Sequence, residues 1–310
     1  MKFKGFKNRE DRVDIYTDLA LEEREKFKDN VEIDGVELKK KYNDELKMTT
    51  TLVNIKTEKG AKVMGKPKGH YITIETKYAK EDDKYNQKKI SDELLKNIGH
   101  LINANIGKDK RPEAILIVGL GNAQATPDAI GPRTASLVQI RKNIYCISPG
   151  VLAQTGMETG EIVEGIVKKI HPDALVVIDA LAAKSSERLN RTIQISNTGI
   201  APGSGVGNHR NEITEKTMGI PVIAIGVPTV ISIPSLACDI MEAFCASQGE
   251  GMKDIFCSWP EKEKYHFLGE ILDEKLWELF VTPKEIDEAV KRISYTLSEG
   301  INQFVAGRIF

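Results

Sequence analysis

The chain has 310 residues, which is enough for one large domain or two small ones. Charged residues make up 29% and hydrophobic residues 41%, an ordinary balance for a globular protein. The net charge of -1 gives no electrostatic reason to expect nucleic acid or a membrane surface as a partner. No apolar run approaches the roughly 20 residues of a membrane span, and the basic N-terminus has no apolar core of the kind found in signal peptides.

The first 45 residues are dense in charge and poor in periodicity. We expect residues 1–30 to be flexible or loosely docked. Within them, the stretch from Asp18 through Phe27 is compatible with a short helix, with Thr17 or Asp18 as its N-cap ahead of Glu22.

The pattern changes to strands between Met48 and Lys77. Residues 50–56 and 71–77 alternate along the chain and are rich in β-branched side chains, which favours two strands. Residues 85–106 then repeat apolar side chains at helical spacing, so we expect an amphipathic helix there.

Residues 112–230 alternate short apolar runs with helical segments. This rhythm predicts an α/β fold: a doubly wound, mainly parallel sheet with helices on both faces. Residues 191–196 interrupt it as an added strand or hairpin arm, and a glycine-rich loop follows at 199–209. The predicted strands are 114–119, 143–148, 174–179 and 221–226, and the predicted helices are 128–141, 158–170 and 234–247.

The rest of the chain adds a smaller β-rich part before this core and a charged tail after it. Thr282-Pro-Lys-Glu-Ile-Asp predicts the cap of a last helix that runs to about Leu297. We therefore expect one α/β domain with its core at 112–250 and a C-terminal helix at 283–298.

Two aspartates follow buried apolar runs within this core. Asp128 comes shortly after the run 115–118 and a glycine turn, and Thr126-Pro127 before it predicts a helix start. Asp179 ends the run 174–178. Because ligands collect at the carboxyl ends of strands in open α/β sheets, both acids open into one cleft if the two strands are parallel neighbours.

Two carboxylates in one cleft can share a proton, so one serves as an acid and the other as a base toward water. Both aspartates also have ordinary interpretations. Asp128 can be a charge at a helix N-terminus, and Asp179 a cap at a strand end. The residues alone leave these alternatives open.

Other chemistries fit less well. Gly119 and Gly121 begin a dinucleotide fingerprint, but Gln124 stands where that fingerprint is continued, and its third glycine is missing. Ser204 lacks the flanking glycines of a nucleophile elbow. His209 is the histidine best placed to reach the cleft, so Asp128, Asp179 and His209 remain candidate metal ligands without any supporting local spacing.

The four cysteines lack metal-pair spacing and favour free thiols in a reducing compartment: Cys146, Cys238, Cys245 and Cys257.

At these positions the sequence resembles the germination proteases of spore-forming bacteria. The motifs that carry the resemblance are specific as a set, and they extend across most of 115–230 and return near the C-terminus. They are Val118-Gly-Leu-Gly-Asn122, Thr126-Pro-Asp-Ala, Ile178-Asp-Ala-Leu-Ala-Ala183, Thr192-Ile-Gln-Ile-Ser with Gly199, Pro202-Gly-Ser-Gly-Val-Gly-Asn208, Ile220-Pro-Val-Ile-Ala-Ile-Gly-Val-Pro-Thr229 and Val281-Thr-Pro-Lys-Glu285.

The resemblance implies an endopeptidase that degrades small acid-soluble spore proteins during germination. It assigns the catalytic roles to Asp128 and Asp179, in aspartic-type chemistry without a metal or other cofactor. It also implies a fold like that of the hydrogenase-maturation endopeptidases, whose corresponding carboxylates hold a metal. A metal-dependent endopeptidase that uses the same two acids is therefore the alternative.

The resemblance further implies a self-processing zymogen located in the cytoplasm of the forespore or spore core. Thr17-Asp18-Leu19-Ala20 is similar to the processing site of the family, with the cut between Asp18 and Leu19. Residues 1–18 would then be a propeptide and 19–310 the peptidase domain. The resemblance also implies a homotetramer, with no nucleic acid or membrane partner. The segment from about 248 to 280 departs from the family pattern by being shorter, which affects expectations about subunit contacts and substrate access.

Overall fold

The computed structural model describes residues 17–27, 32–106, 112–201, 211–248 and 256–307. Most of the expected propeptide lies outside the described residues, as does most of the glycine-rich loop, with Ser204 and His209. No helix within the described ranges is long and apolar enough to cross a membrane.

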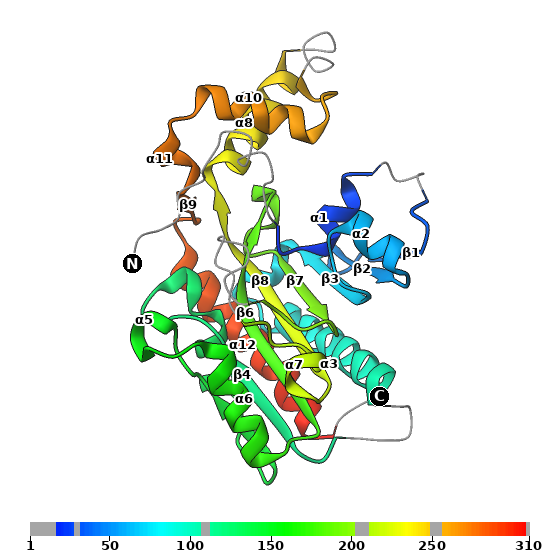
Figure 1. Cartoon of the computed structure of the whole chain (residues 1–310), viewed down its shortest axis with the longest axis vertical. Helices are drawn as coiled ribbons and strands as arrows, with labels where there is room; N and C mark the ends of the chain where they lie inside the picture. Colours follow the sequence, from blue (N-terminus) through cyan, green and yellow to red (C-terminus); the bar gives the residue numbers. More distant parts are fainter. Residues whose placement is uncertain (1–16, 28–31, 107–111, 202–210, 249–255, 308–310) are drawn as a thin grey trace.

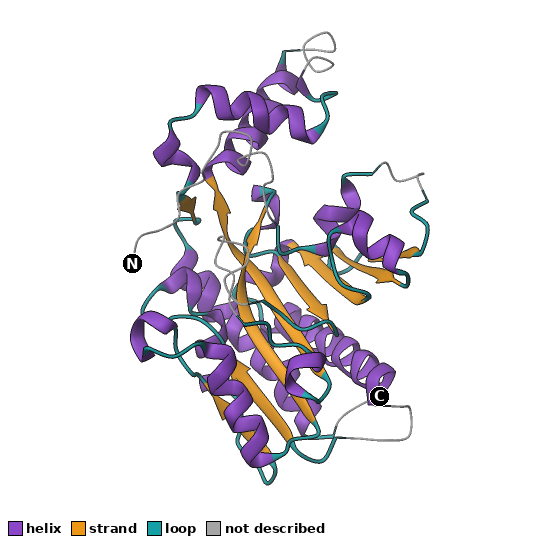
Figure 2. Cartoon of the chain, in the orientation of Figure 1, coloured by secondary structure: helices purple, strands orange, loops and turns teal. Residues whose placement is uncertain are grey.

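The described strands form a single sheet that runs through the molecule (Figure 2). Its order is β1-β2-β3-β7-β8-β6-β4-β5, and β9 pairs with β8 off this path. The strands are β1 (Val36–Asn43), β2 (Met48–Ile55), β3 (Gly69–Thr76), β4 (Ile115–Gly119), β5 (Ile144–Ile147), β6 (Ala174–Ala183), β7 (Thr192–Ser196), β8 (Val222–Ser232) and β9 (Phe280–Val281).

The central part of the sheet confirms the predicted α/β class. Strands β5, β4, β6 and β8 run parallel. The β-rich N-terminal part extends the same sheet, because β3 pairs antiparallel with β7 and β7 pairs antiparallel with β8. The predicted added strand, β7, is thus the element that joins the two parts.

Helices cover both faces of the central strands. On one face, α3 (Lys84–Ile106) and α12 (Ile286–Val305) share one apolar cluster with Val176 and Ile178 of β6. On the other, α6 (Thr159–Ile170) packs on Leu175 and Val177. This alternation is the period-2 pattern of a strand buried on both sides, and each such aliphatic side chain contributes about 1.5–3 kcal/mol by leaving water.

The remaining helices are short or lie at the ends of the sheet. In Figure 1, α1 and α2 lie beside the β1–β3 end, and α8, α10 and α11 lie together beyond the tip of β8. This upper group has its own apolar cluster around Phe256, Tyr265 and Leu268. The bounds are α1 (Ala20–Glu25), α2 (Glu58–Met64), η2 (Lys77–Lys80), η3 (Thr126–Asp128), α4 (Ile130–Ser136), α5 (Leu152–Thr155), η4 (Ser186–Arg188), α7 (Glu215–Met218), α8 (Ile233–Ser247), α10 (Glu261–Ile271) and α11 (Glu274–Trp277).

Two strands are longer than predicted. The expected strand end at Asp179 is wrong, because β6 continues to Ala183. Its partner β8 likewise continues to Ser232, and the two strands remain paired through a bulge between Leu181 and Ala182. In a loop after Asp179, the backbone N–H and C=O groups would have lacked partners in the sheet. In the structure, these groups of β6 pair with β8.

Two helix starts also differ from the predictions. The expected helix 128–141 is shorter, since Thr126–Asp128 form a separate 3₁₀ turn before α4. The expected C-terminal helix 283–298 begins later and ends later, at Ile286–Val305. Neither threonine caps its helix. The Thr126 hydroxyl donates to Asp287, and the Thr282 hydroxyl donates to the carbonyl oxygen of Thr229.

Candidate active site

Asp128 is fixed by the turn that follows β4. The backbone N–H of Asn122 donates to Oδ2 of Asp128 over 2.6 Å. Gly121 has φ +110, and a Cβ there would lie 2.1 Å from the carbonyl oxygen of Asp128, so only glycine allows this approach. The carbonyl oxygen of Pro127 accepts a hydrogen bond of 2.6 Å from the Thr229 hydroxyl of β8. The turn is therefore held from both sides.

Asp179 is buried in β6, with 6% of its surface exposed. The backbone N–H of Ala180 donates to its Oδ1 over 2.9 Å. Strand β4 ends opposite Ile178, and the N–H of Leu120 donates to the carbonyl oxygen of Ile178. Asp179 is thus the first residue of β6 beyond its pairing with β4, and the turn η3 that carries Asp128 packs against β6 and β8. Both acids lie at the same end of the parallel strands.

A glutamine that the sequence analysis did not single out joins Asp179 in a cross-strand row. Gly226 of β8 is in register with Asp179 of β6 on one side and with Gln194 of β7 on the other. Residues in register across neighbouring strands present their side chains on the same face. Asp179 and Gln194 therefore share a face of the sheet, with a residue without a side chain between them.

The expected processing site lies against this face. The N–H of Asp18 donates to the carbonyl oxygen of Ala182, and the N–H of Ala182 donates to Oδ2 of Asp18 over 2.9 Å. The side-chain amide of Gln194 donates to the carbonyl oxygen of Asp18 (3.1 Å) and accepts from the N–H of Ala20 (2.7 Å). The chain thus crosses β6 and β7 with its backbone bonded to both.

Leu19 is fully buried at this crossing. Its side chain packs with Leu181, Ala183, Leu189 and Ile200. The predicted cap at Thr17 or Asp18 is wrong: Leu19 holds the N-cap position of α1, and its N–H donates to the Thr17 hydroxyl. Tertiary packing, rather than a local cap, decides how this segment lies.

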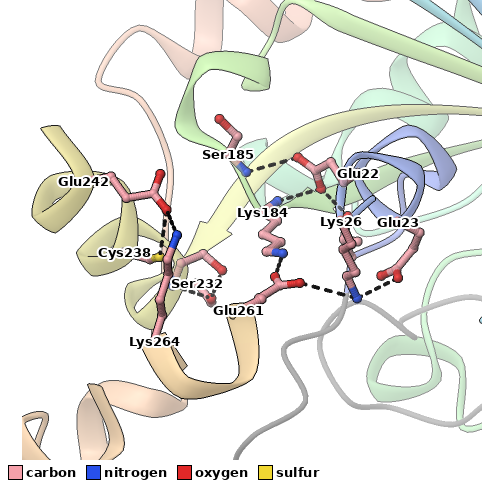
Figure 3. Close-up of polar contacts among 12 residues, drawn as sticks. Glu22, Glu23, Lys26, Lys184, Ser185, Ser232, Cys238, Glu242, Glu261 and Lys264 are labelled. Atoms are coloured by element: carbon pink, nitrogen blue, oxygen red, sulfur yellow. Dashed lines mark hydrogen bonds and ion pairs between the residues drawn. The ribbon is translucent and has the colours of Figure 1, made fainter. Parts of the chain in front are cut away.

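Helix α1 is anchored by a buried carboxylate. Glu22 accepts hydrogen bonds from the backbone N–H groups of Lys184 (2.9 Å) and Ser185 (3.0 Å), as Figure 3 shows. It also pairs with Arg188, which contacts Glu25 and Glu75 as well. Burial opposes the charge of Arg188, but these three carboxylates outweigh it and raise the pKa of the guanidinium.

A second group of charges links α1 to the helices beyond β8. Lys26 pairs with Glu23 (2.6 Å) and with Glu261 of α10 (3.8 Å), and Lys184 pairs with Glu261 (Figure 3). Burial lowers the pKa of Lys184 to about 8, assisted by the nearby Lys26. The pocket between these elements is therefore lined by charges of both signs.

Lys66, in the turn after α2, faces the expected processing site. Its ammonium group donates to the carbonyl oxygen of Thr17 over 2.7 Å. Burial of that group lowers the pKa of Lys66, and the carboxylates of Asp18, Glu23 and Glu22 oppose the shift. A cation therefore lies close to the acidic side chain at position 18.

Two other expectations concern metals and thiols. Within the described residues, no group of three or more His, Cys, Asp or Glu side chains is arranged to hold a metal ion, and His209 lies outside that part of the chain. The four cysteines are free thiols. Burial raises the pKa of Cys146 and of Cys238 to about 11, so neither is activated as a nucleophile.

Comparison with known proteins shows to which family the chain belongs. The family model described as germination protease matches residues 14–257. The chain belongs to the germination protease family. A germination protease of Caldanaerobacter subterraneus subsp. tengcongensis is 42% identical over 93% of each chain. One from Clostridium perfringens is 41% identical over 93% of this chain and 94% of its own, and one from Priestia megaterium is 35% identical over 92% and 90%.

These matches confirm the resemblance found in the sequence motifs, and family membership makes the chain a peptidase. Among solved structures, the hydrogenase maturation protease HycI from Thermococcus kodakarensis KOD1 matches 54% of this chain and 94% of its own. Its identity is 17% and its TM-score is 0.30, so this similarity supports no argument. The α/β class rests on the sheet itself.

Proposed function

We propose that this chain is an endopeptidase that begins the degradation of small acid-soluble spore proteins during germination. Its membership of the germination protease family supports this substrate class. We infer that it is made as a zymogen, with residues 1–18 as the propeptide, 19–310 as the peptidase domain, and self-processing between Asp18 and Leu19. On the same grounds it acts as a homotetramer in the forespore or spore core.

Asp128 and Asp179 are the proposed general acid and base. The observation that carries this role is the placement of both carboxylates at one end of β4 and β6, where each accepts a backbone hydrogen bond. The ionised carboxylate takes a proton from water as the water oxygen bonds to the carbonyl carbon of Asp18. The protonated one gives its proton to the nitrogen of Leu19 as the C–N bond breaks. Water is consumed, and a carboxyl group and an amine are formed.

Self-processing of the purified 310-residue chain tests this proposal. At mildly acidic pH, mass spectrometry should detect a new N-terminus at Leu19 in the wild type and none in Asp128→Asn or Asp179→Asn. Each variant should unfold in urea like the wild type. Asp173→Asn is a matched control, because that carboxylate accepts from the backbone N–H groups of Glu113 and Ala114, outside the proposed site.

The control should still be cut. A wild-type rate in either site variant would remove that aspartate from the mechanism. Loss of cutting after dialysis against a chelator, restored by one divalent ion, would replace the metal-free mechanism with the metal-dependent alternative.

A further inference from the structure

Gln194 makes an unusual pair of contacts with the chain's own N-terminal segment. Its amide nitrogen donates to the carbonyl oxygen of Asp18 and its amide oxygen accepts from the N–H of Ala20. A neighbouring strand would pair with an extended segment in this way. The carbonyl that Gln194 contacts is that of the peptide bond which self-processing would cut, so this inference rests on the proposed function.

Gln194 and Asp179 lie on the same face of the sheet, one on each side of Gly226. Both are in register with Gly226, and neighbouring strands lie about 4.8 Å apart, so their backbones are separated by about 10 Å. A Cβ at Gly226 would lie 2.3 Å from the side chain of Leu181, which packs against Leu19. Glycine thus lets the side chain of Leu181 fill the space over Gly226, from where it packs against Leu19, the residue that follows the expected cut.

Gln194 is also held rigidly and away from water. It is 8% exposed, and both ends of its amide are occupied. When water adds to a peptide carbonyl, negative charge develops on the carbonyl oxygen. A fixed N–H donor that already points at this oxygen stabilises the charge without reorganisation, and its effect is largest in a site with little water.

We propose that Gln194 is a catalytic residue: its amide N–H polarises the carbonyl of the peptide bond that is cut and stabilises the oxyanion that forms there. The bond between Asp18 and Leu19 is the first such substrate. The same donor then serves peptides that bind to β7 after the propeptide has left. Asp128 and Asp179 supply the proton transfers, and Gln194 supplies the charge stabilisation that two carboxylates cannot provide.

A merely structural role would make Gln194 a clamp for the N-terminal segment. Two substitutions separate the roles. Gln194→Glu keeps an oxygen that can accept from the N–H of Ala20 but replaces the donor to the Asp18 carbonyl. Gln194→Met removes both contacts at similar volume. Ser196→Ala is the matched control, since Ser196 lies two residues along β7 on the same face and its hydroxyl accepts from Thr198.

Two quantities are measured for the full-length chain and for each variant. Mass spectrometry gives the rate at which the Leu19 terminus appears, and hydrogen exchange gives the protection of residues 19–26. We expect Gln194→Glu to process about 100-fold more slowly or worse, the usual cost of losing one oxyanion donor. Exchange protection should stay near that of the wild type, and Ser196→Ala should process normally.

The contrary results are equally definite. A wild-type rate in Gln194→Glu or Gln194→Met would overturn the proposal. So would rates that fall in both variants only in proportion to lost exchange protection, since that result identifies a clamp. If the wild type makes no Leu19 terminus, the proposed processing fails and this inference fails with it. If the wild type processes itself and both Gln194 variants do so at the same rate, only the role of Gln194 is ruled out and the proposed processing stands.

Discussion

At the scale of single residues, the N-terminal segment depends on a cation placed beside it. Lys66 donates to the carbonyl oxygen of Thr17, and its charge lies near Asp18. A hydrogen bond from a charged donor contributes about 1.5–3 kcal/mol, and its acceptor here belongs to a buried residue. Lys66 is therefore one of the residues that set how tightly the expected processing site is docked.

Lys66→Met keeps the length of the side chain and removes its charge. We expect backbone amides of residues 17–20 to exchange hydrogen about 10-fold faster or more, because a loss of about 1.4 kcal/mol corresponds to a factor of ten. Mass spectrometry of the N-terminal peptide measures this. Lys68→Met is the control, since that exposed lysine pairs with Glu58 on the surface. Equal exchange in the wild type and Lys66→Met would show that the segment is held without Lys66.

Single residues also mark the limit of what the sequence could predict. Asp128 and Asp179 could be proposed from the sequence because each follows a local apolar run. Gln194 stands in the motif Thr192-Ile-Gln-Ile-Ser and in an alternating strand, but neither feature indicates which residues its side chain contacts. Its contacts to Asp18 and Ala20 join positions 174 to 176 residues apart, and only the order of β6, β8 and β7 brings them together.

At the scale of elements, α1 is a short helix that depends on its neighbours. Six residues cannot form a stable helix alone, since nucleation is unfavourable and few hydrogen bonds follow it. Glu22 compensates by bonding the backbone at Lys184 and Ser185 and by pairing with Arg188. The sequence predicted a helix here from its charge pattern, but it could not reveal that a buried carboxylate anchors it.

Glu22→Gln should detach this helix. The amide replaces one acceptor oxygen with a donor. In either orientation this donor faces one of the two backbone N–H groups, together with Arg188 or the Thr17 hydroxyl, so we expect a local loss of about 3 kcal/mol. Brief trypsin digestion of the folded chain should then cut at Arg24, which is buried in the wild type. Glu23→Gln, which loses a pair with Lys26 near the surface, should resist trypsin like the wild type. Equal resistance of Glu22→Gln would mean that apolar packing alone holds α1.

At the scale of the whole molecule, β8 connects every part of the proposed site. It pairs with β6, which carries Asp179, and with β7, which carries Gln194. Its Thr229 hydroxyl donates to the turn before Asp128, and its tip pairs with β9 near the helices beyond the sheet. The apolar run 221–226 predicted the first half of this strand. The second half was missed because its pairing with β6 and β9 is set by residues distant in sequence.

Thr229→Val tests whether β8 positions the turn that carries Asp128. Valine matches threonine in shape and removes one hydrogen bond, leaving the carbonyl of Pro127 without the donor it has in the fold. We expect a loss of about 1–3 kcal/mol in the free energy of unfolding, measured by urea denaturation. Self-processing should slow as well, because the proposed catalytic role of Asp128 depends on the position of its carboxylate.

Thr51→Val is a closely matched control for that substitution. Thr51 and Thr229 are both fully buried strand residues, but the Thr51 hydroxyl has no hydrogen-bond partner within the described structure. Its replacement should leave stability unchanged or raise it, because a buried hydroxyl without a partner costs free energy. If both variants lost the same stability, the effect would come from core packing. If self-processing slows in Thr229→Val but not in Thr51→Val, the hydrogen bond from Thr229 is what positions the turn that carries Asp128.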